Sequence, residues 1–199
     1  MSGPFERHSD VTVERCVAAF PSHLAADVRV ALEALPRASY EPMVDDASEV
    51  RISGEPVRIL CRVYFPQPPA ESVETLGHHH RQIVAALMTR HHDGYVRERW
   101  VAELLPSSEP WVPAFVVPLL GEYVVEIVQA VQRGVSRGHD AYEAFGRENP
   151  DWCRRMNARM ISYWDLHYRR STPRFRDYPG YQAAAALGVW KERPLRGRP

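Results

Sequence analysis

The residues best suited to chemistry in this sequence are histidines, which form two groups near the middle of the chain. Residues 78–80 are three consecutive histidines, and His91 and His92 are followed directly by Asp93. Imidazole nitrogens and carboxylate oxygens bind divalent metal ions. On one helix His80 and His91 would lie roughly 16 Å apart, so the two groups cannot share an ion. We therefore treat His91, His92 and Asp93 as a candidate metal-binding element of their own.

The His92-Asp93 doublet resembles the metal-binding element of HD-type phosphohydrolases, which are all-helical enzymes. The resemblance rests on the apolar residues 86–88 followed by the doublet and Gly94. It implies a divalent metal cofactor, and it requires an earlier histidine and a later aspartate from other helices. The chain offers His8 and His23 before the doublet, and Asp140, Asp151 and Asp165 after it. The structural alternative is that His91 and His92 end a helix, where positive charge is favourable.

Two carboxylates one helical turn apart, Glu122 and Glu126, form a second candidate metal site. Carboxylates that project inward from several helices of a bundle bind pairs of metal ions. Here no Glu-x-x-His motif accompanies them, and the same line continues through Gln129 and Arg133. The pattern therefore favours an exposed polar stripe along a helix over a metal site.

Residues 134–138 read Gly-Val-Ser-Arg-Gly and fit the G-x-S-x-G motif of a nucleophile elbow. In that element a strand leads into a strained turn that exposes the serine, here Ser136. The hydrolase fold that carries it needs several strand–helix units before the elbow. Residues 1–110 indicate helices and one hairpin instead, so we interpret the match as a chance occurrence in a short loop.

Charge is balanced over the whole chain and unevenly distributed along it. The sequence has 25 basic and 25 acidic residues, so it has no overall electrostatic attraction to nucleic acid or to anionic membranes. Residues 151–199 carry 11 basic and four acidic groups, a net charge of +7, which leaves −7 on residues 1–150. The basic segment is therefore the part of the chain to examine for partners.

Arginines alternate with aromatic residues in this basic segment. The candidate interaction surface comprises Arg154, Arg155, Arg159, Trp164, Arg169, Arg170 and Arg174. Arginine with aromatic residues is the composition of protein-interface hot spots, and it also binds single-stranded nucleic acid. A further interpretation places the aromatic residues in the core and pairs the arginines with the acidic first part of the chain. We expect a protein partner or self-association, with nucleic acid as the alternative.

Other features exclude several protein classes. The three cysteines, Cys16, Cys61 and Cys153, are odd in number and far apart, which excludes a disulfide framework and a C-x-x-C metal site. The polar N-terminus does not match a signal peptide. The most apolar stretch, residues 111–131, contains two glutamates that disfavour a membrane span. No Walker loop, dinucleotide fingerprint or HExxH motif occurs.

These exclusions, with buried free thiols, indicate a cytoplasmic protein. Of the 25 basic residues, 24 are arginine and Lys191 alone is lysine. This preference for arginine over lysine is typical of a GC-rich bacterial gene.

Prolines and apolar spacing predict the elements that must position these residues. Proline breaks helix interiors, and the 17 prolines leave windows in which helices can lie. Apolar residues at helical spacing predict helices at 10–20, 22–35, 73–90, 95–105, 111–132, 142–147, 150–170 and 181–187. Asp10 and Asn149 are the expected N-caps of the first helix and of the 150–170 helix. The β-branched residues within 123–131 leave a buried strand there as an open alternative.

One β-hairpin is predicted at about residues 49–65. Residues 49–53 and 57–65 are rich in β-branched and aromatic side chains, and they flank Gly54-Glu55-Pro56, a turn sequence. Further along, Asp93, Val96 and Arg97 begin a segment that resembles the second helix of a HEAT repeat, although no copy recurs at the period of such repeats.

We therefore expect a mainly α fold, a helical bundle-like single domain over residues 1–190 with one β-hairpin and a disordered C-terminal tail at 191–199. The expected function is a non-catalytic protein-interaction or accessory module without a cofactor. The alternatives are a metal-dependent, HD-like phosphohydrolase that uses His92 and Asp93, and nucleic-acid binding through the basic C-terminal third.

Overall fold

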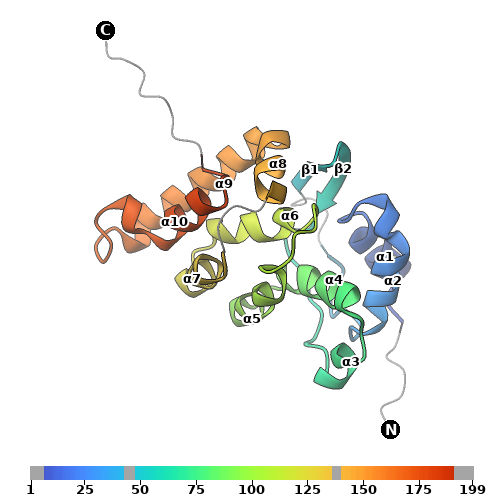
Figure 1. Cartoon of the computed structure of the whole chain (residues 1–199). Helices are drawn as coiled ribbons and strands as arrows, with labels where there is room; N and C mark the ends of the chain where they lie inside the picture. Colours follow the sequence, from blue (N-terminus) through green and yellow to red (C-terminus); the bar gives the residue numbers. More distant parts are fainter. Residues whose placement is uncertain (1–6, 43–47, 136–139, 191–199) are drawn as a thin grey trace.

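The structure, a computed structural model, describes residues 7–42, 48–135 and 140–190 (Figure 1). In these ranges the chain is mainly α-helical with one two-stranded antiparallel sheet, as the sequence predicts. The N-terminal helices lie at one end of the molecule and the C-terminal helices at the other, with α4 to α7 between them (Figure 1). The hairpin lies between the N-terminal helices and α8 (Figure 1).

The first two predicted helices form a packed pair. They are α1 (Asp10–Val17) and α2 (Ala25–Glu33), and the short 3-10 helix η1 (Ser22–Leu24) precedes α2. Ser9, not the expected Asp10, caps α1, because the Ser9 hydroxyl accepts a hydrogen bond from a backbone N–H of the first turn at 3.2 Å. Asp10 is then the first helical residue, where its negative charge is still favourable.

The hairpin consists of β1 (Ser48–Ile52) and β2 (Glu55–Ile59). Its turn lies at Ser53-Gly54, where both residues have positive φ, 52° and 85°, which is typical of a two-residue type I′ turn. The predicted second strand is too long. Beyond Ile59 the chain leaves β1 and runs along the end of α4, where Val63 N–H donates to the Arg90 carbonyl.

The helix predicted at 73–90 is two helices, α3 (Ala70–Glu74) and α4 (His78–Met88), separated at Gly77. The second half of α4 is completely buried and packs against α2 and α5 (Gly94–Leu104). Asp93 caps α5, because its Oδ1 accepts a hydrogen bond from Tyr95 N at 2.9 Å. The histidine groups thus lie at the two ends of α4.

The prediction of one continuous helix at 111–132 is wrong. This stretch divides into α6 (Pro113–Val116), the 3-10 helix η2 (Val117–Gly121) and α7 (Val125–Gly134). Pro118 lacks the N–H that a continuous helix requires. Glu122 follows η2 in an extended conformation, with φ −86° and ψ 149°. Residues 125–131 are helical, which decides against the strand alternative there.

The C-terminal helices are α8 (Asp140–Glu148), α9 (Pro150–Tyr163) and α10 (Pro179–Ala186), with the 3-10 helix η4 (Phe175–Asp177) before α10. The predicted helix over 150–170 is present, but it ends in a π-helical segment, η3 (Trp164–Tyr168), in which Arg169 N–H donates to the Trp164 carbonyl. The predicted alanine-rich helix is α10. The predicted tail, residues 191–199, lies outside the described residues.

Asn149 does not cap α9 as expected. Its side chain makes no capping hydrogen bond. Instead Oδ1 accepts from Arg51 N at 2.7 Å, and Nδ2 donates to the Arg51 carbonyl at 2.7 Å and to the Phe145 carbonyl at 3.1 Å. The residue therefore joins the α8–α9 corner to the edge of the hairpin.

One cluster of buried hydrophobic residues runs through the described part of the chain, from Cys16 to Val189. Among the described residues, Cys16, Cys61 and Cys153 form no disulfide bond, and burial raises the pKa of the Cys16 thiol to about 12. In the residues that the structure describes, no helix combines the length and the apolar character needed to cross a membrane.

Candidate interaction surface

The His-Asp element lies in the connection between α4 and α5 and is built into the fold. His91 is buried, and its Nδ1 accepts from Asp93 N at 3.0 Å. Its Nε2 therefore carries the proton and donates to the Phe65 carbonyl at 2.8 Å. Burial lowers the pKa of His91, which favours the neutral ring. Both nitrogens are occupied, so His91 holds the chain after β2 against the end of α4.

The other predicted metal ligands also have structural contacts, and the His92 ring lies 4.2 Å from that of His91 between centroids. His92 is exposed and stacks on Tyr64, with 5.2 Å between ring centroids, while the Asp93 carboxylate caps α5. Glu126 is exposed on α7, and Glu122 is buried next to arginines. In residues 7–42, 48–135 and 140–190, no group of three or more His, Cys, Asp or Glu side chains is placed to hold a metal ion.

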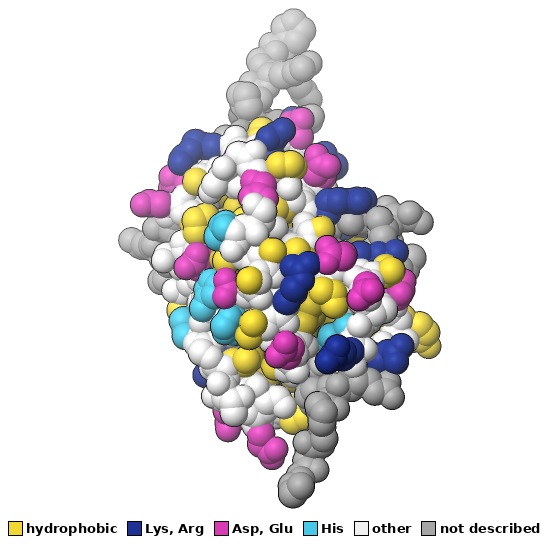
Figure 2. Space-filling view, turned by 90° about the vertical axis from the view of Figure 1, so that its right-hand side faces the viewer, with side chains coloured by type: hydrophobic (Ala, Val, Ile, Leu, Met, Phe, Trp, Pro, Cys, Tyr) yellow, Lys and Arg dark blue, Asp and Glu magenta, His cyan; other side chains and the backbone are white. Residues whose placement is uncertain are grey.

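The second histidine group joins α4 to α2. His80 Nε2 lies 3.0 Å from Asp27 Oδ1, and His79 Nε2 lies 3.8 Å from Asp27 Oδ2. Figure 2 shows histidines gathered beside acidic side chains on this face of the molecule. The arrangement is a partly exposed polar contact between two helices, with a hydrogen bond between His80 and Asp27, and it accounts for these histidines as structural residues.

Glu122 is the centre of a buried charge cluster that the sequence did not predict. It is 2% exposed, whereas the sequence pattern placed it on a solvent-facing stripe. Arg62 Nη2 lies 3.1 Å from Glu122 Oε1, and Arg97 Nη2 lies 3.3 Å from Oε2. Arg97 Nη1 also donates to the His91 carbonyl at 2.7 Å. The expected stripe is wrong because α7 begins only at Val125, which leaves Glu122 free to turn inward.

Arg90 adds a third guanidinium to this cluster. It is buried, and desolvation lowers its pKa to about 10 although the charge of Glu122 acts in the opposite direction. Two arginines thus contact the Glu122 carboxylate directly, and Arg90 is close enough to feel its charge. The cluster joins the segment after β2, the α4–α5 connection and η2, and it has a structural role in holding them together.

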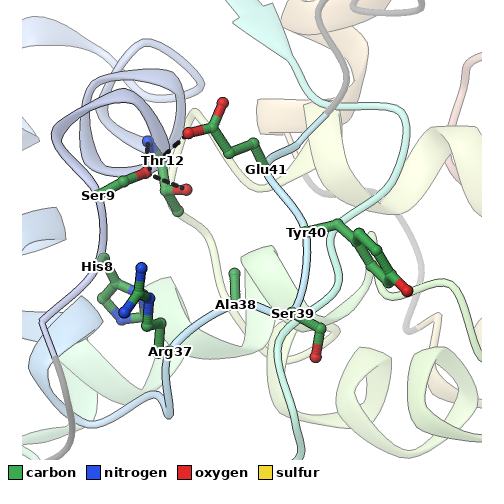
Figure 3. Close-up of a pocket in the computed structure, with 8 residues that line it drawn as sticks. All are labelled: His8, Ser9, Thr12, Arg37, Ala38, Ser39, Tyr40 and Glu41. Carbon is green, nitrogen blue, oxygen red and sulfur yellow. Dashed lines mark hydrogen bonds between the residues drawn. The ribbon is translucent and has the colours of Figure 1, made fainter.

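A small polar pocket of about 150 Å³ lies where the N-terminal end of α1 meets residues 37–41. Figure 3 shows Ser9, Thr12 and Glu41 on one side of it and His8 and Arg37 on the other, while the ring of Tyr40 points away. The Ser9 hydroxyl contacts both Thr12 Oγ1 and Glu41, at 3.1 and 3.2 Å. The hydrogen bond between Ser9 and Glu41 joins residues 37–41 to the start of α1, while the buried Nδ1 of His8 has no hydrogen-bond partner among the described residues.

The predicted arginine-rich surface follows α9 and η3, where its residues form two adjacent lines. The first line has a spacing of three or four residues and consists of Arg155, Arg159, Ser162, Leu166 and Arg170, all exposed. The second line consists of Arg154, Ala158, Ile161, Asp165 and Arg169, also exposed. We call the first line the basic face of α9.

The two lines differ in how their charges are satisfied. In the second line Arg169 pairs with Asp165 at 2.8 Å, and Arg154 pairs with Asp151. In the basic face Arg159 lies over the ring of Tyr163 at 5.6 Å. Within the described part of the chain, Arg155 and Arg170 form no ion pair or hydrogen bond through their side chains. The basic face therefore presents charge that the fold does not use.

Exposed apolar side chains accompany these arginines. Leu166 is 75% exposed in the middle of η3, and Ile161 is 39% exposed in the second line. Tyr123, 55% exposed, lies beside Tyr163 with 6.2 Å between ring centroids. The π-helical turn displays Leu166 between Arg159 and Arg170, and such turns are frequent at functional sites.

Most of the aromatic residues of the predicted surface pack beneath it. Trp164 contacts Phe175 with 5.0 Å between centroids, and its indole N–H donates to the Thr172 carbonyl at 2.9 Å. The Tyr168 hydroxyl donates to the Tyr123 carbonyl at 2.5 Å. Arg174 is exposed in the loop before η4. Trp164 is thus a support for the surface, while the arginines form its outer layer.

The G-x-S-x-G match gains no support from the fold. Gly134 ends α7, so a helix and not a strand precedes the motif. Residues 136–138, which include Ser136, lie outside the described residues.

Comparisons of the chain with protein-family models, with curated proteins and with solved structures give no match.

Proposed function

We propose that this chain is a non-catalytic protein-interaction module that binds an acidic partner protein through the basic face of α9. The observation that carries the proposal is Leu166, which is 75% exposed between arginines. An exposed leucine alone is ordinary, but here arginines, which are enriched at interface hot spots, stand on both sides of it. Ile161 and Tyr123 extend the apolar area to either side.

The chemistry of the surface favours protein over nucleic acid. Single strands bind on aromatic rings that are free to stack with bases. Here Trp164 and Tyr168 have their polar atoms bonded within the fold and their rings packed on neighbours. Tyr123 is an exposed ring of this surface, but its most exposed apolar side chain, Leu166, is aliphatic, as is Ile161. A protein surface that carries both carboxylates and apolar side chains would complement the arginines and the aliphatic side chains of this face.

The test is capture of a partner from extracts of the native host, with and without nuclease, followed by titration of the identified partner. Leu166→Asp places a negative charge in the centre of the basic face. We expect it to weaken partner binding at least about tenfold, the equivalent of 1.4 kcal/mol. Val30→Asp is the matched control, because Val30 is another exposed aliphatic residue, on α2.

Two outcomes contradict the proposal. Equal binding by both variants would remove the basic face of α9 as the interface. Capture that disappears with nuclease, and weakens steeply with salt, would favour nucleic acid as the partner.

A further inference from the structure

A second surface feature is a groove between α5 and the end of α7, which lie side by side in the lower part of Figure 1. It is open to solvent and has a volume of about 540 Å³. One face of α5 supplies Tyr95, Arg99 and Ala102, and α7 supplies Ala130 and Arg133. The groove shares no residue with the basic face of α9.

The floor of the groove is apolar and contains two small side chains, Ala102 and Ala130, which line it beside Leu105 and Pro106. A Cβ atom at Gly134 would lie 2.2 Å from Leu105 Cδ1, so only glycine allows the end of α7 to approach Leu105 this closely. Small residues on the floor leave room for a bulky side chain that the fold itself does not supply.

The walls of the groove carry unused positive charge. Arg99 projects from α5 and Arg133 from α7, and in the described ranges neither side chain takes part in an ion pair or a hydrogen bond. Glu98 is the one acidic residue among those that line the groove, so the lining has a net charge of +1. Tyr95, 83% exposed, stands at the N-terminal end of α5 with an apolar ring and a polar hydroxyl.

We propose that this groove is a peptide-binding site for a segment of a partner protein that carries a bulky apolar side chain flanked by carboxylates. The apolar side chain fills the space above Ala102 and Ala130, and the carboxylates pair with Arg99 and Arg133. Binding of an amphipathic segment in a groove between helices is an established mode of recognition. The site is separate from the basic face of α9 and does not depend on it.

The probe is a display library of random peptides of about 12 residues, selected on the full chain. The expected enriched sequences contain Leu, Ile, Phe or Trp flanked by Asp or Glu. An enriched peptide is then synthesised with a fluorophore and titrated by polarisation. Arg99→Glu with Arg133→Glu, and separately Ala102→Trp, should each weaken its binding at least about tenfold, the equivalent of 1.4 kcal/mol.

Controls separate this site from the rest of the molecule. Arg58→Glu changes an exposed arginine on the hairpin and should leave peptide binding unchanged, as should Leu166→Asp. Far-UV circular dichroism verifies that each variant folds. The proposal is overturned if no acidic and apolar consensus is enriched, or if the enriched peptide binds the groove variants as tightly as the unaltered chain. Dimerisation of the chain that the groove variants abolish would assign the groove to a second copy and would equally overturn it.

Discussion

At the scale of single residues, Glu122 shows that a buried carboxylate is stable only when opposite charges and hydrogen bonds surround it. It is the acidic group in direct ionic contact with Arg62 and Arg97, and Arg90 lies within the same buried cluster. Removing a charge from water is unfavourable unless an opposite charge and hydrogen bonds compensate for it. Here one negative charge compensates for several positive ones, so its loss leaves buried cations unmatched.

We predict that Glu122→Gln lowers the free energy of unfolding by about 3–5 kcal/mol, as expected when one partner of a buried ion pair is removed. Urea denaturation of the purified variant measures the change. Glu126→Gln is the matched control, since Glu126 is an exposed residue of α7, and it should alter stability by less than about 0.5 kcal/mol. Equal effects of the two substitutions would contradict the buried cluster.

Residue roles with local causes could be predicted from the sequence, and roles with distant causes could not. Glu122 and Glu126 have the spacing of one helical face, but the helix begins between them. The partners of Glu122 lie 60 and 25 residues away along the chain, at Arg62 and Arg97. No local pattern specifies such contacts. The same holds for His91, whose position after an apolar helix suggested a metal ligand while its bond to Phe65 makes it structural.

At the scale of elements, two adjacent residues join the hairpin to the α8–α9 corner: Glu148, whose carboxylate accepts from Ser53 N–H and Gly54 N–H, and Asn149. A cap needs only an acceptor at this position, and Asn and Asp serve equally well as caps. The structure uses the amide as both acceptor and donor, because Oδ1 binds Arg51 N–H and Nδ2 binds two carbonyls. An aspartate retains the first bond and loses the other two.

We predict that Asn149→Asp destabilises the chain by about 1–3 kcal/mol, because the Arg51 carbonyl loses its side-chain donor and faces a carboxylate oxygen instead, while the Phe145 carbonyl keeps the Asn149 backbone N–H. Thermal and urea unfolding measure the loss. The reciprocal change, Asp93→Asn, is the control at a true cap, where the side chain accepts from Tyr95 N, and it should cost only a few tenths of a kcal/mol. If Asn149→Asp proved as mild as Asp93→Asn, Asn149 would be a cap after all.

Most helices could be predicted because their apolar spacing and prolines are local signals. The structure differs where one predicted helix is in fact two or more shorter ones. These breaks lie at Gly77, after which α4 begins, and after Pro118, where the chain turns. The second strand ends early because the segment after Ile59 finds its hydrogen-bond partners at the end of α4. The groove is a product of two helices from separate parts of the sequence, and no motif within either one indicates it.

At the scale of the whole molecule, the uneven charge along the chain persists on the folded surface. The sequence allowed the C-terminal arginines to pair with the acidic first 150 residues. On α9 and η3, however, Arg154 and Arg169 pair with carboxylates of the same helical segment, Asp151 and Asp165. The basic face of α9 thus keeps its charge, which would accelerate encounter with an acidic partner in a salt-dependent way.

The corresponding prediction is that charge reversal on this face leaves folding intact and impairs association. Arg155→Glu with Arg170→Glu should change the free energy of unfolding by less than about 0.5 kcal/mol, because neither side chain has a charged partner within the described residues. The same double variant should slow partner association, most strongly at low ionic strength, since long-range attraction is screened within about 10 Å at 0.1 M salt. Urea unfolding and stopped-flow association over a salt series test both parts. A marked loss of stability would mean that these arginines serve the fold, and unchanged association would move the interface elsewhere on the molecule.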